Sequence, residues 1–171
     1  MEVGAYSSLI RKLVANGILE EITRGYYKLA GQDETEYSEM EGISVIIPHG
    51  VFCLISALSF HNIGTQKAFE YHIAIPNGKW IPSHTEFNYH IYQFGEKSYI
   101  SGIEHYGRIK VYSIAKTVAD CFKFRNQIGQ DIALEALKDA IKNKRTTISD
   151  ILDQAEVCRV KKVIIPYLES F

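Results

Sequence analysis

The sequence predicts an α+β fold: a small N-terminal helix-and-hairpin unit, then a mixed α/β domain that ends in a helical bundle. Three observations support this prediction. Apolar residues recur at helical spacing near the N-terminus, alternating strand-like runs occupy the middle of the chain, and helical periodicity dominates after residue 113. With 171 residues, the chain is long enough for one domain with a sizeable core and a smaller appendage.

The N-terminal unit is predicted from a short amphipathic helix and the tight hairpin that follows it. A helix is expected over residues 6–16, with a left-handed stop at Gly17, and strands are expected over residues 18–22 and 26–29. Helix, glycine stop and hairpin, in this order, match the recognition helix and wing of a winged helix-turn-helix. The residues that fit the spacing of that motif are Leu9, Leu13, Gly17, Leu19, Arg24, Gly25, Tyr27 and Leu29. Residues 1–31 are therefore expected to form a partial winged helix-turn-helix.

A partial winged helix would meet DNA with the exposed start of its helix and with its wing. Hydroxyl and cationic groups serve there, because they donate hydrogen bonds to bases and phosphates. The predicted DNA-binding residues are Ser7, Ser8, Arg11 and Lys12 on the helix, and Arg24, Tyr26 and Lys28 on the wing. A generic basic helix and hairpin without a DNA ligand is the alternative interpretation.

The predicted winged helix is incomplete. Only five residues precede its helix, whereas two further helices normally come before a recognition helix. Those helices would pack against the apolar face formed by Leu9, Ile10, Leu13 and Val14. Two explanations stay open: the chain is truncated or mis-started, or this segment docks on the second domain instead.

An acidic stretch separates the N-terminal unit from the rest of the chain. Residues 32–42 contain five acidic residues and no basic one, and they lack apolar periodicity, so we expect a linker there. The domain after it, residues 43–171, is expected to contain a buried helix over residues 50–62. The strands expected after this helix cover residues 71–76, 87–94, 103–106 and 108–112.

Helical periodicity dominates the C-terminal part of the chain. The expected helices cover residues 114–126, 130–144, 148–156 and 159–170. The expected N-caps are Ser113 for the first helix and Thr147 or Ser149 for the third. In the first of these helices, Val118 and Phe122 belong to an apolar stripe that predicts a buried face. Lys116, Lys123 and Arg125 are therefore expected to project from the other face.

The chain resembles a known family along three stretches near its C-terminal end. They are Tyr112–Gly129 (YSIAKTVADCFKFRNQIG), Asp131–Ala140 (DIALEALKDA) and Val157–Glu169 (VCRVKKVIIPYLE). These stretches closely resemble the C-terminal domain of the AbiE-type antitoxins, the AbiEi family of bacterial transcriptional regulators that are paired with a nucleotidyltransferase toxin. The similarity is strongest over residues 112–169 and covers nearly all residues from about Tyr6 onward.

The resemblance implies an antitoxin of a type IV toxin–antitoxin system that acts in abortive infection, a form of phage defence. Its C-terminal domain would oppose the cognate nucleotidyltransferase toxin, which in that family happens without a stable complex between the two proteins. Its winged helix would repress its own operon by binding operator DNA. The resemblance implies no cofactor and no catalytic activity for the antitoxin itself, so no metal site is expected.

Basic side chains of the C-terminal helices form the predicted antitoxin surface. These residues are Lys116, Lys123, Arg125, Arg159, Lys161 and Lys162. Residues 108–145 have a net charge of +5 in a chain whose net charge is −1, and the alternative interpretation is a set of solvated helix faces. Two further alternatives stay open: an antitoxin domain that does not bind DNA, and a nuclease-like enzyme that uses Asp120 with Lys116.

Other patterns exclude several function classes. No apolar run reaches the ~20 residues that span a bilayer, and no signal peptide is evident, so we expect a cytoplasmic protein without a membrane partner. The three cysteines form no Cys-x-x-Cys pair, which predicts reduced, mostly buried thiols. His72, His84 and His90 lack the spacing of metal ligands. Glu135 and Asp139 are four residues apart, which predicts one helix face.

Overall fold

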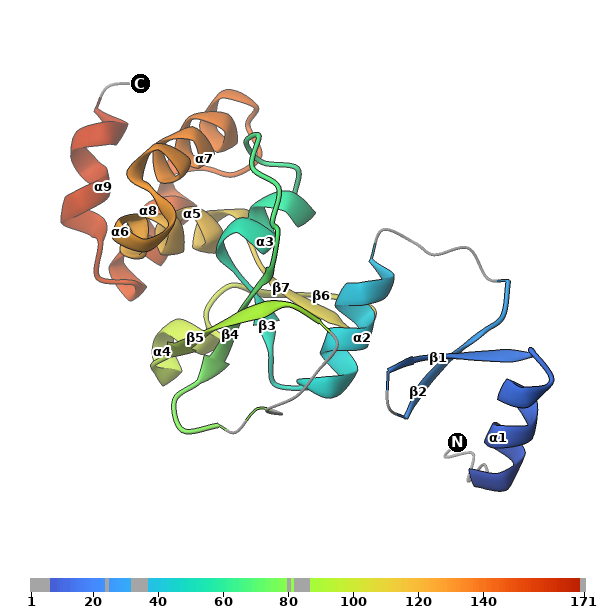
Figure 1. The fold of residues 1–171 in the computed structure, drawn as a ribbon. Helices are drawn as coiled ribbons and strands as arrows, with labels where there is room; N and C mark the ends of the chain where they lie inside the picture. The colour runs from blue at the N-terminus through green and yellow to red at the C-terminus, as the bar shows by residue number, and fades with distance from the viewer. Residues whose placement is uncertain (1–6, 24, 32–36, 80, 82–86, 170–171) are drawn as a thin grey trace.

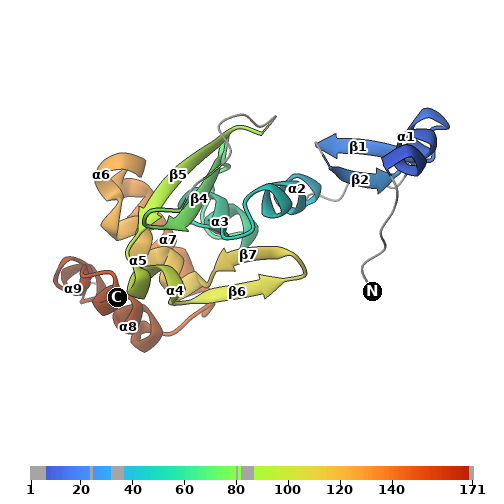
Figure 2. The ribbon, with the colours of Figure 1, turned by 90° about the horizontal axis from the view of Figure 1, so that it is seen from below.

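The computed structural model describes residues 7–23, 25–31, 37–79, 81 and 87–169 of the chain (Figure 1). It confirms an α+β architecture, with two separate sheets among these residues. A two-stranded sheet belongs to the N-terminal unit, and a five-stranded sheet forms the centre of the larger domain. In both views the N-terminal unit stands apart from the larger domain, whose nearest helix is α2 (Ser38–Ile46) (Figures 1 and 2).

The N-terminal unit has the predicted order of helix and hairpin. It consists of α1 (Ser7–Ala15), β1 (Leu19–Thr23) and β2 (Tyr26–Leu29), and the two strands are antiparallel. The helix ends where Gly17 takes a φ of 67° and donates a hydrogen bond of 3.0 Å to the carbonyl of Val14. This is the predicted left-handed stop, because glycine has no Cβ that clashes in this conformation.

Helix α2 occupies part of the segment for which a linker is predicted. Residues 38–42 are helical, so the linker prediction is wrong there, and residues 32–36 lie outside the described residues. Met40, Ile43 and Ile47 recur at helical spacing and are buried in the core, which stabilises the helix despite its acidic composition. The acidic residues of its first turn also interact favourably with the positive end of the helix.

Five strands form the central sheet in the order β5-β4-β3-β7-β6. They are β3 (Val51–Phe52), β4 (Tyr71–Pro76), β5 (Tyr89–Phe94), β6 (Ile103–Tyr106) and β7 (Ile109–Tyr112). β3 is antiparallel to β4 and parallel to β7, β4 and β5 are parallel, and β6 and β7 form an antiparallel hairpin. The strands expected from residue 71 onward are therefore confirmed, with small differences at their ends.

The predicted buried helix over residues 50–62 is only partly correct. Strand β3 replaces its first turn, and the helix α3 covers Leu54–Phe60. Phe52 pairs with Ile73 of β4 on one side and with Val111 of β7 on the other. A short apolar run fits a buried strand as well as a buried helix, and here the two neighbouring strands decide the conformation.

The C-terminal part of the chain is helical, as predicted. Its helices are α5 (Ile114–Lys123), α6 (Arg125–Ile128), α7 (Gln130–Lys142), α8 (Ile148–Val157) and α9 (Lys161–Leu168). A further short helix, α4 (Glu96–Ile100), precedes β6 and is not predicted by the sequence pattern. Two predicted caps are confirmed: Ser113 accepts a hydrogen bond from the amide of Lys116, and Thr147 forms a capping box with Asp150. Within the described residues, no helix combines the length and the apolar character that crossing a bilayer requires.

The central sheet separates two apolar cores. Helix α2 covers one face, where Met40 and Ile43 belong to the same core cluster as Ile73 (Figure 1). The C-terminal helices cover the other face, and α5 is their central member, since it packs against α3, α7, α8 and α9. Every residue from Ala115 to Phe122 is buried. This position decides the environment of Lys116, because a helix that is covered all round has no solvent face.

Candidate functional site

The predicted DNA-binding side chains of α1 lie on its exposed surface. Ser7, Ser8, Arg11 and Lys12 are all exposed, and α1 contains no acidic residue. At 3.6 residues per turn, these four positions share one side of the helix. The structure therefore brings hydroxyl groups at the start of α1 next to two cations one turn later, without a competing carboxylate on the helix.

The opposite side of α1 is apolar and only partly covered. It consists of Leu9, Ile10, Leu13 and Val14, none of which is buried, and Leu9 is 49% exposed. In the described part of the chain, α1 packs mainly against β1 of its own hairpin. Apolar surface that a folded helix normally buries therefore remains accessible on α1.

The predicted wing residues are less available than those of the helix. Lys28 Nζ lies 3.5 Å from Glu20 Oε2, and the Lys28 side chain is only 17% exposed. These two residues face each other in the register of β1 and β2, so their ion pair belongs to the hairpin itself. Tyr26 is half-buried, and Arg24 lies outside the described residues. The helix, rather than the described part of the hairpin, presents cations to solvent.

Lys116 is not part of the surface, and the prediction that it projects from α5 is wrong. Its side chain is completely buried, and its Nζ is paired with the Asp120 carboxylate, which is completely buried as well. The ammonium lies 4.2 Å from the ring centroid of Tyr112 and 4.7 Å from that of Phe94. The polar side of α5 turns inward because the carboxylate and the two aromatic faces compensate the buried charge.

Burial also controls protonation around this ion pair. Burial raises the pKa of the Asp120 carboxyl above its usual value, although the Lys116 ammonium opposes this shift. Cys158 Sγ donates a hydrogen bond of 3.2 Å to Asp120 Oδ1, and burial together with this carboxylate raises the pKa of Cys158 to about 12. Cys53 and Cys121 are also buried, and burial is the main reason why their pKa values are raised. The expectation of buried thiols is confirmed. Because Lys116 and Asp120 are completely buried, they lie out of reach of a substrate.

Two further predicted cations are half-buried at the junction of α5 and α6. Lys123 Nζ lies 4.9 Å from the ring centroid of Phe94 and 5.4 Å from that of Phe124. Arg125 donates a hydrogen bond of 2.7 Å to the carbonyl of Phe122. Each side chain is thus engaged within the domain, with only part of its surface left to a partner.

The remaining predicted cations lie at the turn between α8 and α9. Arg159 and Lys162 are exposed, and Arg159 has a φ of 61°. Lys161 pairs with Glu156 at 2.9 Å, and this hydrogen bond lowers the pKa of Glu156 and raises the pKa of Lys161. Unlike Lys116, these side chains lie where a partner can touch them.

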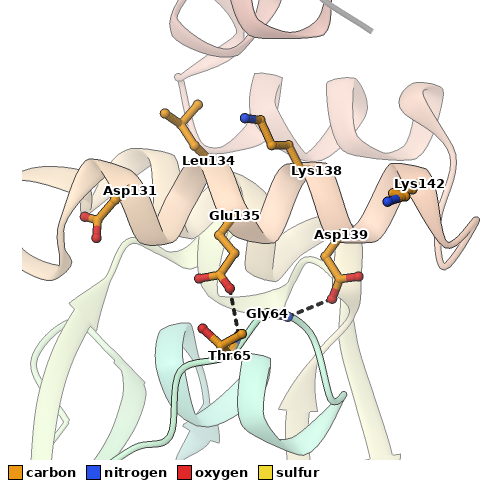
Figure 3. Close-up of a pocket in the computed structure, with 8 residues that line it drawn as sticks. All are labelled: Gly64, Thr65, Asp131, Leu134, Glu135, Lys138, Asp139 and Lys142. Atoms are coloured by element: carbon orange, nitrogen blue, oxygen red, sulfur yellow. Dashed lines mark hydrogen bonds between the residues drawn. The ribbon is translucent and has the colours of Figure 1, made fainter.

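A surface cavity of about 710 Å³ lies between α7 and the loop that follows α3 (Figure 3). Glu135 and Asp139 point from α7 toward this loop, as predicted for neighbours on one helix face. Glu135 Oε1 accepts a hydrogen bond of 3.0 Å from the amide of Thr65, and Asp139 Oδ2 accepts one of 2.7 Å from the amide of Gly64. The spacing of Glu135 and Asp139 could be read from the sequence. The amides that bind them could not be predicted, because they lie 70 or more positions away along the chain.

Two of the three histidines that were considered as metal ligands lie side by side at one edge of the central sheet. His72 and His90 are partners in the register of β4 and β5, with ring centroids 6.4 Å apart, and His84 lies outside the described residues. His72 Nδ1 lies 3.0 Å from the hydroxyl of Tyr92, and burial lowers the pKa of His72. Across the described residues, no group of three or more His, Cys, Asp or Glu side chains has a geometry that could hold a metal ion.

Comparison of the chain with protein-family models gives no match, and comparison with curated proteins gives none either. Function must therefore be inferred from the residues of this chain and their geometry. Of the predicted site residues, the structure groups those of α1 on one exposed side and disperses those of the C-terminal helices among buried, half-buried and exposed positions.

Proposed function

We propose that this chain is the antitoxin of a bacterial abortive-infection toxin–antitoxin pair, as its resemblance to the AbiE-type antitoxins implies. In this proposal, α1 and its hairpin act as recognition helix and wing on operator DNA, and the C-terminal helices oppose a nucleotidyltransferase toxin. The observation that supports it best is the exposed polar side of α1. There Ser7, Ser8, Arg11 and Lys12 stand together on a helix that a hairpin follows.

The polar side of α1 has the chemistry that a DNA groove requires. With its side chains an α-helix such as α1 is about 10–12 Å in diameter, which suits a major groove about 12 Å wide. Arg11 supplies a guanidinium that donates to guanine or phosphate, and Lys12 supplies a second cation. The hydroxyls of Ser7 and Ser8 lie at the positive end of the helix, where phosphate oxygens bind favourably.

A gel shift of the full chain on its own upstream promoter DNA tests the DNA-binding half of this proposal. Specific retention at about 50 mM salt that weakens at about 200 mM salt is expected, because bound cations release counterions from DNA. Arg11→Ala should weaken binding and flatten its salt dependence. Lys97→Ala, which removes an exposed cation of α4, is the matched control and should bind as the wild type does. No shift by the folded protein would refute DNA binding.

The antitoxin half is supported by the exposed cations at the turn between α8 and α9. Co-expression with the cognate toxin tests it, with cell growth as the readout. Arg159→Asn combined with Lys162→Gln should reduce rescue, and asparagine is chosen because it tolerates the positive φ at position 159. Lys97→Gln is the control, and undiminished rescue by the double variant would remove this turn from the antitoxin surface.

An antitoxin domain that does not bind DNA is the second candidate function. The incompletely covered apolar side of α1 favours it, because further helices normally hold a groove-binding helix from that side. Deletion of residues 1–31 should then leave toxin neutralisation intact, since the buried members of both core clusters lie within residues 40–164. Loss of rescue by a folded deletion variant would argue against this candidate.

A further inference from the structure

A second cavity, of about 650 Å³, opens where β4, β5, α6 and the loop of residues 66–70 meet. Its size lies in the range of small-molecule sites, roughly 300–1,000 Å³. None of the residues assigned to DNA or toxin lines it. Aromatic rings, side-chain amides, one cation and one carboxylate make up much of its wall.

Three rings form one side of this cavity. The rings of His72 and Tyr92 are nearly parallel, with an interplanar angle of 15° and centroids 5.5 Å apart. The hydrogen bond between His72 Nδ1 and the Tyr92 hydroxyl, 3.0 Å long, fixes this buried pair. His90 packs on Tyr92 with ring centroids 4.7 Å apart, but His90 is exposed. His90 therefore offers ring surface to a ligand, from a support that is held rigidly beneath it.

Phe69 supplies ring surface from the loop of residues 66–70. It lines the same cavity and is 100% exposed, so it contributes nothing to the core. A single exposed apolar side chain is common on protein surfaces. At this position, however, it shares a cavity with the exposed ring of His90, and two such rings are the means by which proteins hold flat heterocycles.

Polar groups accompany the rings. Asn88 and Gln127 are exposed at the cavity, and Gln66 is half-buried there. Each side-chain amide combines donors with an acceptor, which is the combination that the edges of nucleobases require. Lys67 adds one ammonium group for a phosphate, and Glu70 adds one carboxylate that accepts hydrogen bonds from sugar hydroxyls.

We propose that this cavity binds a free nucleoside monophosphate, whose base contacts the rings of Phe69 and His90 and whose phosphate faces Lys67. A purely apolar ligand would leave the amides unpaired on burial, which is unfavourable. A nucleoside di- or triphosphate would bring more negative charge than a monophosphate to a cavity whose single cation, Lys67, is opposed by Glu70. A neutral flat base with one phosphate group satisfies both constraints. This activity is separate from the proposed antitoxin function and does not depend on it.

Calorimetric titration of the full chain with the monophosphates of adenosine, guanosine, cytidine and uridine, each up to about 5 mM, tests the proposal. Saturable binding of at least one of them is expected. Phe69→Ala and His90→Ala should each weaken binding about tenfold, because each removes one stacking ring. Phe69→Tyr should retain binding, since it keeps the ring. His105→Ala, which removes an exposed histidine from the opposite edge strand β6, is the matched control.

The absence of saturable binding for every monophosphate would overturn the proposal. Unchanged affinity in both alanine variants would do the same, because it would place the nucleotide elsewhere. Binding of single-stranded oligonucleotides without binding of monophosphates would also overturn it. Phe69 and His90 are exposed, so thermal melts of both variants should match the wild type and separate lost binding from lost folding.

Discussion

Lys116 and Asp120 form an ion pair one turn apart on α5, inside the core of the larger domain. The same carboxylate accepts a hydrogen bond from Cys158, which caps the C-terminal end of α8. Gly102 makes room for the lysine: its φ is 71°, and a Cβ built there would lie 2.7 Å from the Cβ of Lys116. The buried pair thus joins α5 to the end of α8 and to the turn before β6.

Replacing one partner of this pair should destabilise the domain strongly. Lys116→Met is expected to lower the free energy of unfolding by about 3–5 kcal/mol, because it leaves the buried Asp120 without its counter-charge. Urea denaturation at neutral pH measures the change. Lys116→Met combined with Asp120→Leu should recover much of the loss, since no unpaired charge remains.

The exposed pair of Lys161 and Glu156 provides the control for this experiment. Lys161→Met breaks an ion pair at the surface, where water solvates both partners, so little change is expected. A Lys116→Met protein as stable as the Lys161→Met protein would contradict the role assigned to the buried pair.

The ion pair shows which part of this site could be predicted from the sequence. Its spacing on one helix could be read directly, and exposed pairs with this spacing contribute only about 0.3–0.5 kcal/mol. Its burial depends on packing by elements far along the chain, which local periodicity does not contain. The sequence does contain one signal that α5 is buried on all sides. The small side chains of Ala115, Thr117 and Ala119 let neighbouring helices approach α5 closely.

His72 should make the stability of the domain depend on pH. Burial lowers its pKa below the usual 6.5, His90 lowers it further, and Glu70 opposes the shift. The folded state therefore resists protonation below pH 6.5, whereas the unfolded state takes up the proton. The contribution of His72 to stability is present above pH 6.5 and is lost as the pH falls through the lowered pKa.

Denaturation midpoints at about pH 7.5 and about pH 5 measure this dependence. His72→Gln has no group that titrates in this window and keeps an amide for the Tyr92 hydroxyl. The variant is expected to lose less stability than the wild type between the two pH values. Equal losses in the two proteins would show that another group causes the acid sensitivity.

Asp139 should control the mobility of the loop that follows α3. Asp139→Ala removes the acceptor of the Gly64 amide, whose hydrogen bond is 2.7 Å long, and a hydrogen bond to a charged acceptor contributes about 1.5 kcal/mol or more. Amide hydrogen exchange of Gly64 and Thr65 is therefore expected to accelerate about tenfold. Lys138→Ala changes the same helix at the same cavity without removing an acceptor, so it serves as the control. Unchanged exchange in Asp139→Ala would mean that Glu135 alone holds the loop.

The strands illustrate the same division between local and long-range information. Alternation along residues 71–76 and 87–94 was sufficient to predict β4 and β5. It identifies which side chains share a face, but it does not identify the neighbouring strand or the register. The contact between His72 and His90, and hence the cavity beside them, arises from a parallel pairing that no local pattern specifies. The exposed side of α1, by contrast, follows from helical spacing alone, which is why it could be predicted.

Thr147 should stabilise the larger domain through the start of α8. Its hydroxyl accepts a hydrogen bond of 3.0 Å from the amide of Asp150, whose carboxylate in turn accepts one of 3.3 Å from the amide of Thr147. Thr147→Ala removes the side-chain half of this capping box and is expected to lower the free energy of unfolding by about 1 kcal/mol in urea denaturation.

Ser149, the other cap that the sequence suggests, lies inside α8 and is exposed, so it provides the matched control. Ser149→Ala should leave the free energy of unfolding nearly unchanged or raise it slightly, because alanine favours a helix interior. Equal losses in Ser149→Ala and Thr147→Ala would contradict the assigned cap. The loss of stability in Thr147→Ala should appear in the global unfolding transition, because Ile151 and Ala155 anchor α8 in the core that surrounds α5.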